Sequence, residues 1–446
     1  MEKINFLPIL MIIIGLSTFC LFLYFNFDIL QPTISFFLVM TISLGLGTVN
    51  IERWNLYVGP DTSLIVIAGM FSFAIGASFV HYSFYKRNDN VQKMNEQVYF
   101  GIYHIPKVLI FICTSIVLIL AYFSFKELYD LSIQLGNQDG VANMIKTLRY
   151  PLERGQIHFS RWISYREVVA MVIATSFLYF FINNLIINGR FKLVDSWFIL
   201  PVLASFSFFV LSTGRRSLIH FIICGLILGA ILYQQKYGIS YKVKVKILEL
   251  IGLTGIFAIV LYFVLGFLTG KVSVGGRSPL TIIAHYGGLS VPALEQYVST
   301  PHVESQYILQ NTMMGIYGNL NSLGFNLELG HPFLPFVEFQ GTEHIDTNVY
   351  TIFYRLLADY SFPGMIIIMF LFGVLLTYCY DCLKHADKPE LLAIYAYYGY
   401  IPFFLFIDDQ FMGLFTTRTI YFVCLLYSFI YLLRKKYFTL LSKKQF

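Results

Sequence analysis

Residues 4–25 read INFLPILMIIIGLSTFCLFLYF, a stretch with no charged side chain. A helix needs roughly 20 apolar residues to cross the hydrocarbon core of a bilayer. Backbone N–H and C=O groups in lipid must find hydrogen-bond partners within the structure, and a helix pairs them within one segment. The strands of a membrane barrel alternate apolar and polar residues, so a continuous apolar run indicates a helix rather than a strand. No small-residue cleavage signal accompanies the stretch, so it predicts a retained membrane span rather than a signal peptide.

The composition extends this interpretation to the whole chain of 446 residues, which is 57% hydrophobic, 18% aromatic and 13% charged. Soluble domains carry about 25% charged residues, and the mean hydropathy here is +0.68. We therefore predict an all-α, polytopic transmembrane protein that forms a single integral membrane domain over residues 1–446. The expected helices number about eleven, at 4–25, 29–49, 62–82, 107–125, 167–187, 195–213, 217–235, 248–270, 360–381, 389–407 and 412–433.

The basic segments predict an orientation. The net charge of +6 is too small to suggest nucleic acid, but its distribution follows the positive-inside rule when the helices are counted alternately. Alternate counting places Met1 outside, unless one crossing before residue 62 is miscounted. The segments predicted to face the cytoplasm are 83–106, NGRFKLVD, QQKYGISYKVKVK, CLKHADKPE and the tail RKKYFTLLSKKQF.

Familiar cofactor motifs are missing from the sequence. The six cysteines show no disulfide pattern, and the lone C-x-x-C of Cys379 and Cys382 is weak evidence for metal or redox chemistry. The chain contains no H-E-x-x-H, Walker loop, G-x-S-x-G or dinucleotide fingerprint. We expect no ATP, other cofactor or metal at the site.

Two adjacent arginines, Arg215 and Arg216, lie in the short turn STGRRSLI (212–219) between two apolar runs. The orientation places this turn on the outer side. Both side chains could reach lipid phosphates by snorkelling. The alternative, which we favour, is that they bind an anionic substrate, since guanidinium groups make bidentate bonds to phosphate.

The first outer connection, 126–166, is amphipathic and basic. Ile145, Leu148, Leu152 and Trp162 could form an interfacial face, so a helix lying on the membrane is as plausible as a substrate site. Its basic residues and its histidine are Lys126, Lys146, Arg149, Arg154, His158, Arg161 and Arg166.

The second outer connection, 271–359, interleaves Gly, Asn, Pro and aromatic residues, which is typical of a structured loop, and loops this long are usually functional. Amides and aromatic rings also suit a sugar. Arg355 and Asp359 would share a helix face if a helix begins near residue 347, either as a stabilising ion pair or as part of a site. In the second case a carboxylate or His344 would take a proton from an attacking hydroxyl while arginines stabilise a departing phosphate. The other candidates in this connection are Arg277, His285, Asp346 and Asn348.

Two stretches resemble the Wzy-type polysaccharide polymerases, relatives of the O-antigen ligases and of the GT-C-like glycosyltransferases. STGRRSLI resembles the family's Ser/Thr-Gly-x-Arg turn, and DTNVYTIFYRLLADYSFPGMIIIMFLFGVL (346–375) resembles its Asn-x-Tyr stretch and Asp-x-x-x-x-Gly helix start. The layout of about eleven helices with two long outer connections agrees along nearly the whole chain.

The resemblance implies an enzyme of the bacterial cytoplasmic (inner) membrane with its active site on the outer, periplasmic face. It would join undecaprenyl-pyrophosphate-linked oligosaccharide repeat units into an O-antigen or capsule, without a nucleotide or tightly bound metal. Its partners would be that lipid-linked substrate and membrane lipids, with a chain-length regulator and a flippase as further candidates. An O-antigen ligase and a transporter or flippase remain the alternatives.

The resemblance also suggests residue roles. Arg215 and Arg216 would hold the leaving pyrophosphate. In the ligase relatives, the best candidate for the general base is a His directly before Asn. Here Thr347 precedes Asn348, so the resemblance does not identify the base, and His344 and Asp346 are the nearby candidates. The resulting catalytic set is Arg216, His344, Asp346 and Asp359, and the substrate-binding set is Arg215, Arg277, His285, Asn348, Arg355, Arg161 and Arg166.

Overall fold

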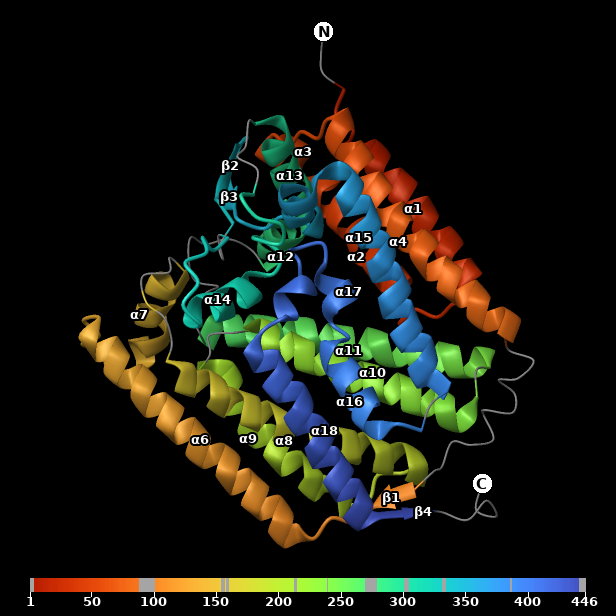
Figure 1. The fold of residues 1–446 in the computed structure, drawn as a ribbon, viewed down its shortest axis with the longest axis vertical. Helices are drawn as coiled ribbons and strands as arrows, with labels where there is room; N and C mark the ends of the chain where they lie inside the picture. Colours follow the sequence, from red (N-terminus) through yellow and green to blue (C-terminus); the bar gives the residue numbers. More distant parts are fainter. Residues whose placement is uncertain are drawn as a thin grey trace. The chain divides into compact units, whose positions relative to one another are not determined.

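The computed structural model describes residues 4–87, 101–153, 157, 160–211, 215–238, 240–268, 279–300, 305–330, 334–385 and 387–440. This part of the chain is mostly helical and contains two antiparallel sheets of two strands each (Figure 1). The predicted all-α, membrane-embedded class is confirmed, while the total of eleven spans and the GT-C-like fold stay predictions. Within these residues, seven helices are long and apolar enough to cross a membrane: α1 (Leu7–Tyr24), α2 (Pro32–Val49), α4 (Pro60–Arg87), α6 (Lys107–Gln134), α8 (Arg161–Asn188), α10 (Arg215–Tyr237) and α15 (Ile352–His385).

The chain forms two compact units. Unit 1 comprises Met1–Asp89, Arg277–Cys382 and Ile401–Thr417. Besides α1, α2, α4 and most of α15, it contains α3 (Ile51–Trp54), α12 (Pro279–Gly288), α13 (Ser290–Ser299), α14 (Met314–Ser322), β2 (Val337–Gln340), β3 (His344–Thr347), α17 (Ile401–Phe404) and η3 (Met412–Leu414).

Small residues allow the long helices of unit 1 to approach closely. In Figure 1, α1, α4 and α15 run alongside one another. A Cβ on Gly76 of α4 would collide with the carbonyl oxygen of Phe370 in α15, and one on Gly373 would collide with that of Phe73. The Ser72 hydroxyl also donates to the Ile366 carbonyl at 2.7 Å. Close backbone contact through small residues is the usual way in which helices associate in lipid.

Helix α15 contains a break that divides it into two parts. Ser361 has φ 55° and ψ −177° inside the helix, and Pro363 follows it. Proline lacks an N–H donor and its ring collides with the carbonyl four residues earlier, which explains a kink here. Residues 352–360 thus form a short first part, and the charge-free run of residues 361–380 forms the spanning part.

The described parts of the connection between residues 271 and 359 contain helices and a hairpin. They fold into α12, α13, α14 and the hairpin of β2 and β3, in which Glu338 lies opposite Asp346 and Gln340 opposite His344. Thr347 ends β3, and α15 begins at Ile352 rather than near residue 347, so Arg355 and Asp359 both lie in the first part of α15.

Unit 2 comprises Asn90–Gly276, Leu383–Tyr400 and Arg418–Phe446. Besides α6, α8 and α10, it contains β1 (Gly101–Tyr103), α7 (Val141–Glu153), η2 (Asp195–Phe198), α9 (Ile199–Leu211), α11 (Tyr241–Leu268), α16 (Pro389–Tyr398), α18 (Thr417–Tyr437) and β4 (Phe438–Leu440).

Segments that the positive-inside rule assigns to the cytoplasm lie together in unit 2. Strand β1 pairs antiparallel with β4, and Asn184 at the end of α8 donates to the Tyr103 carbonyl and to Asp195. Arg434 of α18 forms an ion pair with Asp387 at 2.8 Å. These contacts join parts of four of the segments, while the orientation of the helices stays a prediction.

The apolar face of α7 differs from the expected interfacial face. Met144 and Leu148 are buried against Leu128 of α6 and Ile163 of α8, with Ile145 packed beside them. The amphipathic pattern therefore reflects packing on protein rather than on lipid. Of the four residues predicted for that face, Trp162 at the start of α8 is exposed, and the Leu152 side chain lies outside the described residues.

Candidate functional site

The predicted phosphate-binding arginines begin α10. Helix α10 starts at Arg215, so both arginines lie in its first turn, just before the candidate membrane span Ile219–Tyr237; residues 212–214 of the predicted turn lie outside the described residues. The side chains of Arg215 and Arg216 lie outside the described residues, and so does Arg277.

Asp359, in the first part of α15, binds a loop that lies about 50 residues earlier in the chain, at residues 305–312. Its carboxylate accepts hydrogen bonds from the backbone N–H groups of Asn311 (3.0 Å) and Thr312 (2.8 Å) and from the Thr312 hydroxyl (2.8 Å). The Ser305 hydroxyl and the Asn311 side-chain amide also donate to it, at 2.6 and 3.1 Å. Both carboxylate oxygens are thus engaged by protein donors, which favours a positioning role for Asp359 over proton transfer to a substrate.

Arg355 is also part of this network. Its guanidinium makes a bidentate pair with Asp408, with Nε–Oδ1 at 2.7 Å and a terminal nitrogen 3.0 Å from Oδ2, and donates to the Asn311 carbonyl at 3.1 Å. Its side chain is only 5% exposed. Among the described residues, Arg355 therefore pairs with Asp408 rather than with Asp359, and the predicted i, i+4 ion pair is wrong.

Asp409 is the most unusual ionisable group near this network. Its Oδ1 accepts from the N–H groups of Phe411 (2.9 Å) and Met412 (3.0 Å), whereas Oδ2 is buried without a hydrogen-bond partner in the described structure. Burial raises the pKa of Asp409 to about 7, against the opposing effects of those N–H groups and of Arg355. This carboxyl group can therefore hold a proton near neutral pH.

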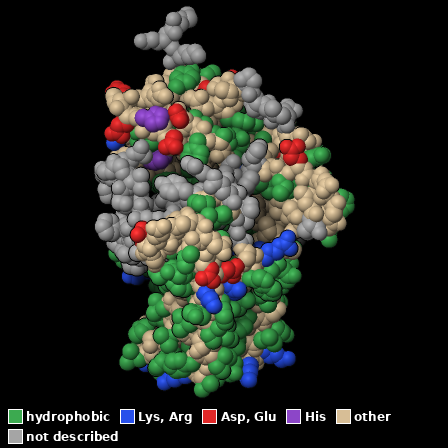
Figure 2. All heavy atoms as spheres, turned by 90° about the vertical axis from the view of Figure 1, so that its left-hand side faces the viewer, with side chains coloured by type: hydrophobic (Ala, Val, Ile, Leu, Met, Phe, Trp, Pro, Cys, Tyr) green, Lys and Arg blue, Asp and Glu red, His purple; other side chains and the backbone are tan. Residues whose placement is uncertain are grey.

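The histidines of the second connection lie on an accessible face of unit 1. His285 Nε2 lies 2.6 Å from the Asp346 carbonyl oxygen, which ties α12 to β3, and the Asp346 side chain is exposed. His344 is 59% exposed, with Nε2 4.0 Å from Glu338 Oε2. Figure 2 shows His side chains beside acidic side chains on one face. Asn348 is half-buried just after β3. The structure thus brings His285, His344 and Asp346 into one region.

The two remaining arginines belong to unit 2. Arg161 is exposed at the first residue of α8. Arg166 is half-buried and forms an ion pair with Glu127 of α6 at 2.8 Å. The Arg166 guanidinium therefore stabilises the packing of α8 on α6.

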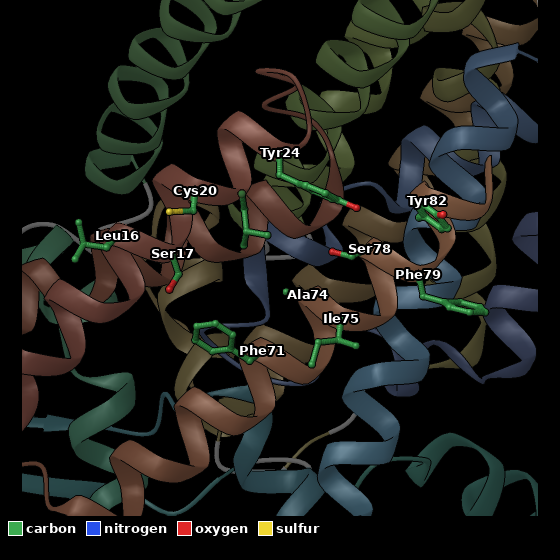
Figure 3. A pocket seen from close by; sticks show the side chains of 11 residues that line it. Leu16, Ser17, Cys20, Tyr24, Phe71, Ala74, Ile75, Ser78, Phe79 and Tyr82 are labelled. Atoms are coloured by element: carbon green, nitrogen blue, oxygen red, sulfur yellow. The ribbon is translucent and has the colours of Figure 1, made fainter. Parts of the chain in front are cut away.

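An apolar groove of about 740 Å³ lies between α1 and α4 (Figure 3). All its residues except Phe71 belong to the second halves of the two helices, which the predicted orientation assigns to the cytoplasmic leaflet. It therefore does not fit the outer-leaflet tail of the expected lipid substrate. The lining residues are Leu16, Ser17, Cys20, Leu21, Tyr24, Phe71, Ala74, Ile75, Ser78, Phe79 and Tyr82.

No group of three or more His, Cys, Asp or Glu side chains that could hold a metal ion occurs among the described residues. The groups that can act chemically near the start of α15 are therefore a buried carboxyl with a raised pKa and, on β3, an exposed imidazole and carboxylate. Proton transfer is within the reach of such a set.

Sequence reasoning missed Asp408 and Asp409, the partners at the centre of this network. One signal was present: IDDQFMG places two adjacent carboxylates between two apolar runs in a chain with few charges. The loop residues Ser305, Asn311 and Thr312 offered no comparable signal, because uncharged polar residues are common throughout that connection.

Comparison of the chain with protein-family models, with curated proteins and with solved structures gives no match.

Proposed function

We propose that the protein is a membrane glycosyltransferase of the polysaccharide polymerase type. It joins lipid-pyrophosphate-linked oligosaccharide repeat units into a surface polysaccharide at the outer face of the cytoplasmic membrane. The growing chain leaves its lipid pyrophosphate as the acceptor hydroxyl of a new repeat unit attacks the anomeric carbon. The hydroxyl loses its proton to a base, and the pyrophosphate leaves with the bonding electron pair.

One observation carries this proposal: the DTNVYTIFYRLLADYSFPG stretch builds the polar start of α15. Asp359 fixes residues 305–312 there, and Arg355 joins them to Asp408. A folded extramembrane connection attached at the mouth of a membrane helix suits a polymeric sugar substrate. A transporter typically places its ionisable groups near the bilayer midplane, whereas Arg355, Asp359 and Asp409 precede the spanning parts of α15 and α18.

The roles within the proposal follow from accessibility. Arg215 and Arg216 hold the pyrophosphate, because developing charge at a poorly hydrated surface requires fixed cations. His344 and Asp346 are the candidate bases, because their side chains are exposed. Asp359 and Arg355 act as positioning residues that keep the connection folded.

Deletion of the gene tests the reaction class. Polymerase loss leaves single repeat units on the surface in place of long chains. Loss of a flippase leaves no surface repeat, and loss of a ligase leaves long chains that are not attached to their final acceptor. Re-expression of Arg216→Lys should fail to restore long chains, whereas Arg190→Lys, a matched change at an exposed residue, should restore them.

A further inference from the structure

The segment Ser305–Gly330, here called the α14 lobe, exposes apolar side chains and carries almost no charge. Ile308 is 70% exposed, Leu323 76%, Phe325 56% and Leu329 47%. Glu328 is the single charged residue between Ser305 and Gly330. Isolated exposed apolar residues are common on proteins, but several within one short, almost uncharged segment mark an interaction surface.

The lobe holds these side chains in a defined conformation. The Asn321 side chain makes paired hydrogen bonds with the backbone of Leu327, at 2.7 and 2.8 Å. Gln310 accepts from the Gln306 N–H at 2.9 Å and donates to the Glu328 carbonyl at 3.3 Å. The exposed apolar side chains therefore lie on a structured element.

Two attachments set the level of the lobe relative to the membrane helices of unit 1. Asp359 binds Asn311 and Thr312 two residues before the charge-free run of α15. The Thr417 hydroxyl, at the last residue of unit 1 and the first of α18, donates to the side-chain oxygen of Asn319 in α14 at 3.0 Å. Gly315 of α14 also packs closely against the Phe415 carbonyl oxygen and the Thr416 side chain. The first attachment directly precedes the charge-free run of α15, so the lobe is held at the end of this candidate membrane span.

We infer that the α14 lobe is an interfacial membrane anchor that inserts Leu323, Phe325 and neighbouring apolar side chains into the outer leaflet. An almost uncharged segment loses little hydration on entering the headgroup and acyl boundary, and apolar elements of this kind lie about 5–10 Å into it. This anchor does not depend on the sugar-transfer activity.

Lipid-borne quenchers test the anchor in the full chain reconstituted in nanodiscs. Phe325→Trp places a reporter in the lobe, and Gln340→Trp places a matched reporter at an exposed position of β2. The unsubstituted protein supplies the background of its three native tryptophans. Lipids brominated near the headgroup should quench the Phe325→Trp emission at least about twofold more than the Gln340→Trp emission, because bromine reaches side chains at interfacial depth. Acrylamide in the water phase should show the reverse order.

Equal quenching of the two reporters by acrylamide, with none by bromolipid, would overturn the inference. Protection of Phe325→Trp from both quenchers would also overturn it, because the surface would then face another protein. Leu323→Trp supplies a second reporter at the most exposed position if Phe325→Trp does not fold.

Discussion

Replacing Asp409 with Asn should stabilise the protein at neutral and alkaline pH. The ordinary pKa of this carboxyl is 3.8, and burial raises it to about 7 in the folded protein. The folded state therefore keeps a proton that the unfolded chain releases between these values. The free energy of unfolding falls as pH rises across this window and becomes level above it. Asn imitates the protonated form and carries no such dependence.

The size of this stabilisation follows from the shift in the pKa of Asp409. About three pH units at 1.36 kcal/mol each set a ceiling of about 4 kcal/mol for the advantage of Asp409→Asn above pH 7. The advantage should become small near pH 4 and vanish below the ordinary pKa of 3.8, where this carboxyl is protonated in both the folded and the unfolded state. Asn also keeps an acceptor oxygen for the N–H groups of Phe411 and Met412.

Thermal unfolding in nanodiscs between pH 4 and pH 8 measures this dependence. Asp408→Asn is the matched control: it removes the charged partner of buried Arg355, so it should destabilise the protein by about 3–5 kcal/mol at neutral pH. If Asp409→Asn were less stable than the native protein at pH 8, or if its advantage did not change between pH 4 and pH 8, the account of Asp409 as a buried proton-holding group would be refuted.

The remaining predictions concern helix packing, the outer connection and the arginine turn. Gly373→Ala should lower the melting temperature markedly, because its Cβ would collide with the Phe73 carbonyl. Gly252→Ala should not lower it, because no atom lies near the new Cβ. Equal melting temperatures of the two variants would contradict the close approach of α4 and α15. Asp359→Ala should increase hydrogen exchange at Asn311 and Thr312, because each amide left unpaired costs about 1–3 kcal/mol; unchanged exchange there would remove its positioning role. Arg216→Lys should abolish long chains if the pyrophosphate needs a bidentate fork, and near-normal chain lengths would rule out that role. A cysteine at Gln340, an exposed position of β2, should react with a membrane-impermeant reagent added to intact cells, and reaction only after lysis would overturn the orientation.

The membrane class could be predicted from the sequence because it depends on local composition. A charge-free run such as residues 4–25 has few stable alternatives in a bilayer. The same holds for the folded second connection, whose Gly, Asn and Pro residues indicated turns rather than disorder.

The contacts around α15 could not be predicted, because they join residues far apart in the chain. Spacing suggested that Arg355 would pair with Asp359, four residues away. Arg355 instead pairs with Asp408, 53 residues later, and Asp359 binds Asn311, 48 residues earlier. Local periodicity cannot rank such partners, since tertiary packing decides between them.

The helix α7 shows a second limit of sequence reasoning. Its amphipathic pattern indicates that one face is apolar, but it does not indicate whether lipid or protein covers that face. Leu128 and Ile163 supply a protein surface from two other helices, and nothing within residues 141–153 indicates them.

Reconstitution of the purified protein with an undecaprenyl-pyrophosphate-linked repeat unit tests the central proposal most directly. The account predicts a ladder of lipid-linked oligomers, with one undecaprenyl pyrophosphate released for each linkage and no requirement for ATP. Movement of the substrate across the bilayer without new glycosidic bonds would contradict it, as would transfer of the glycan only to an acceptor other than a repeat unit.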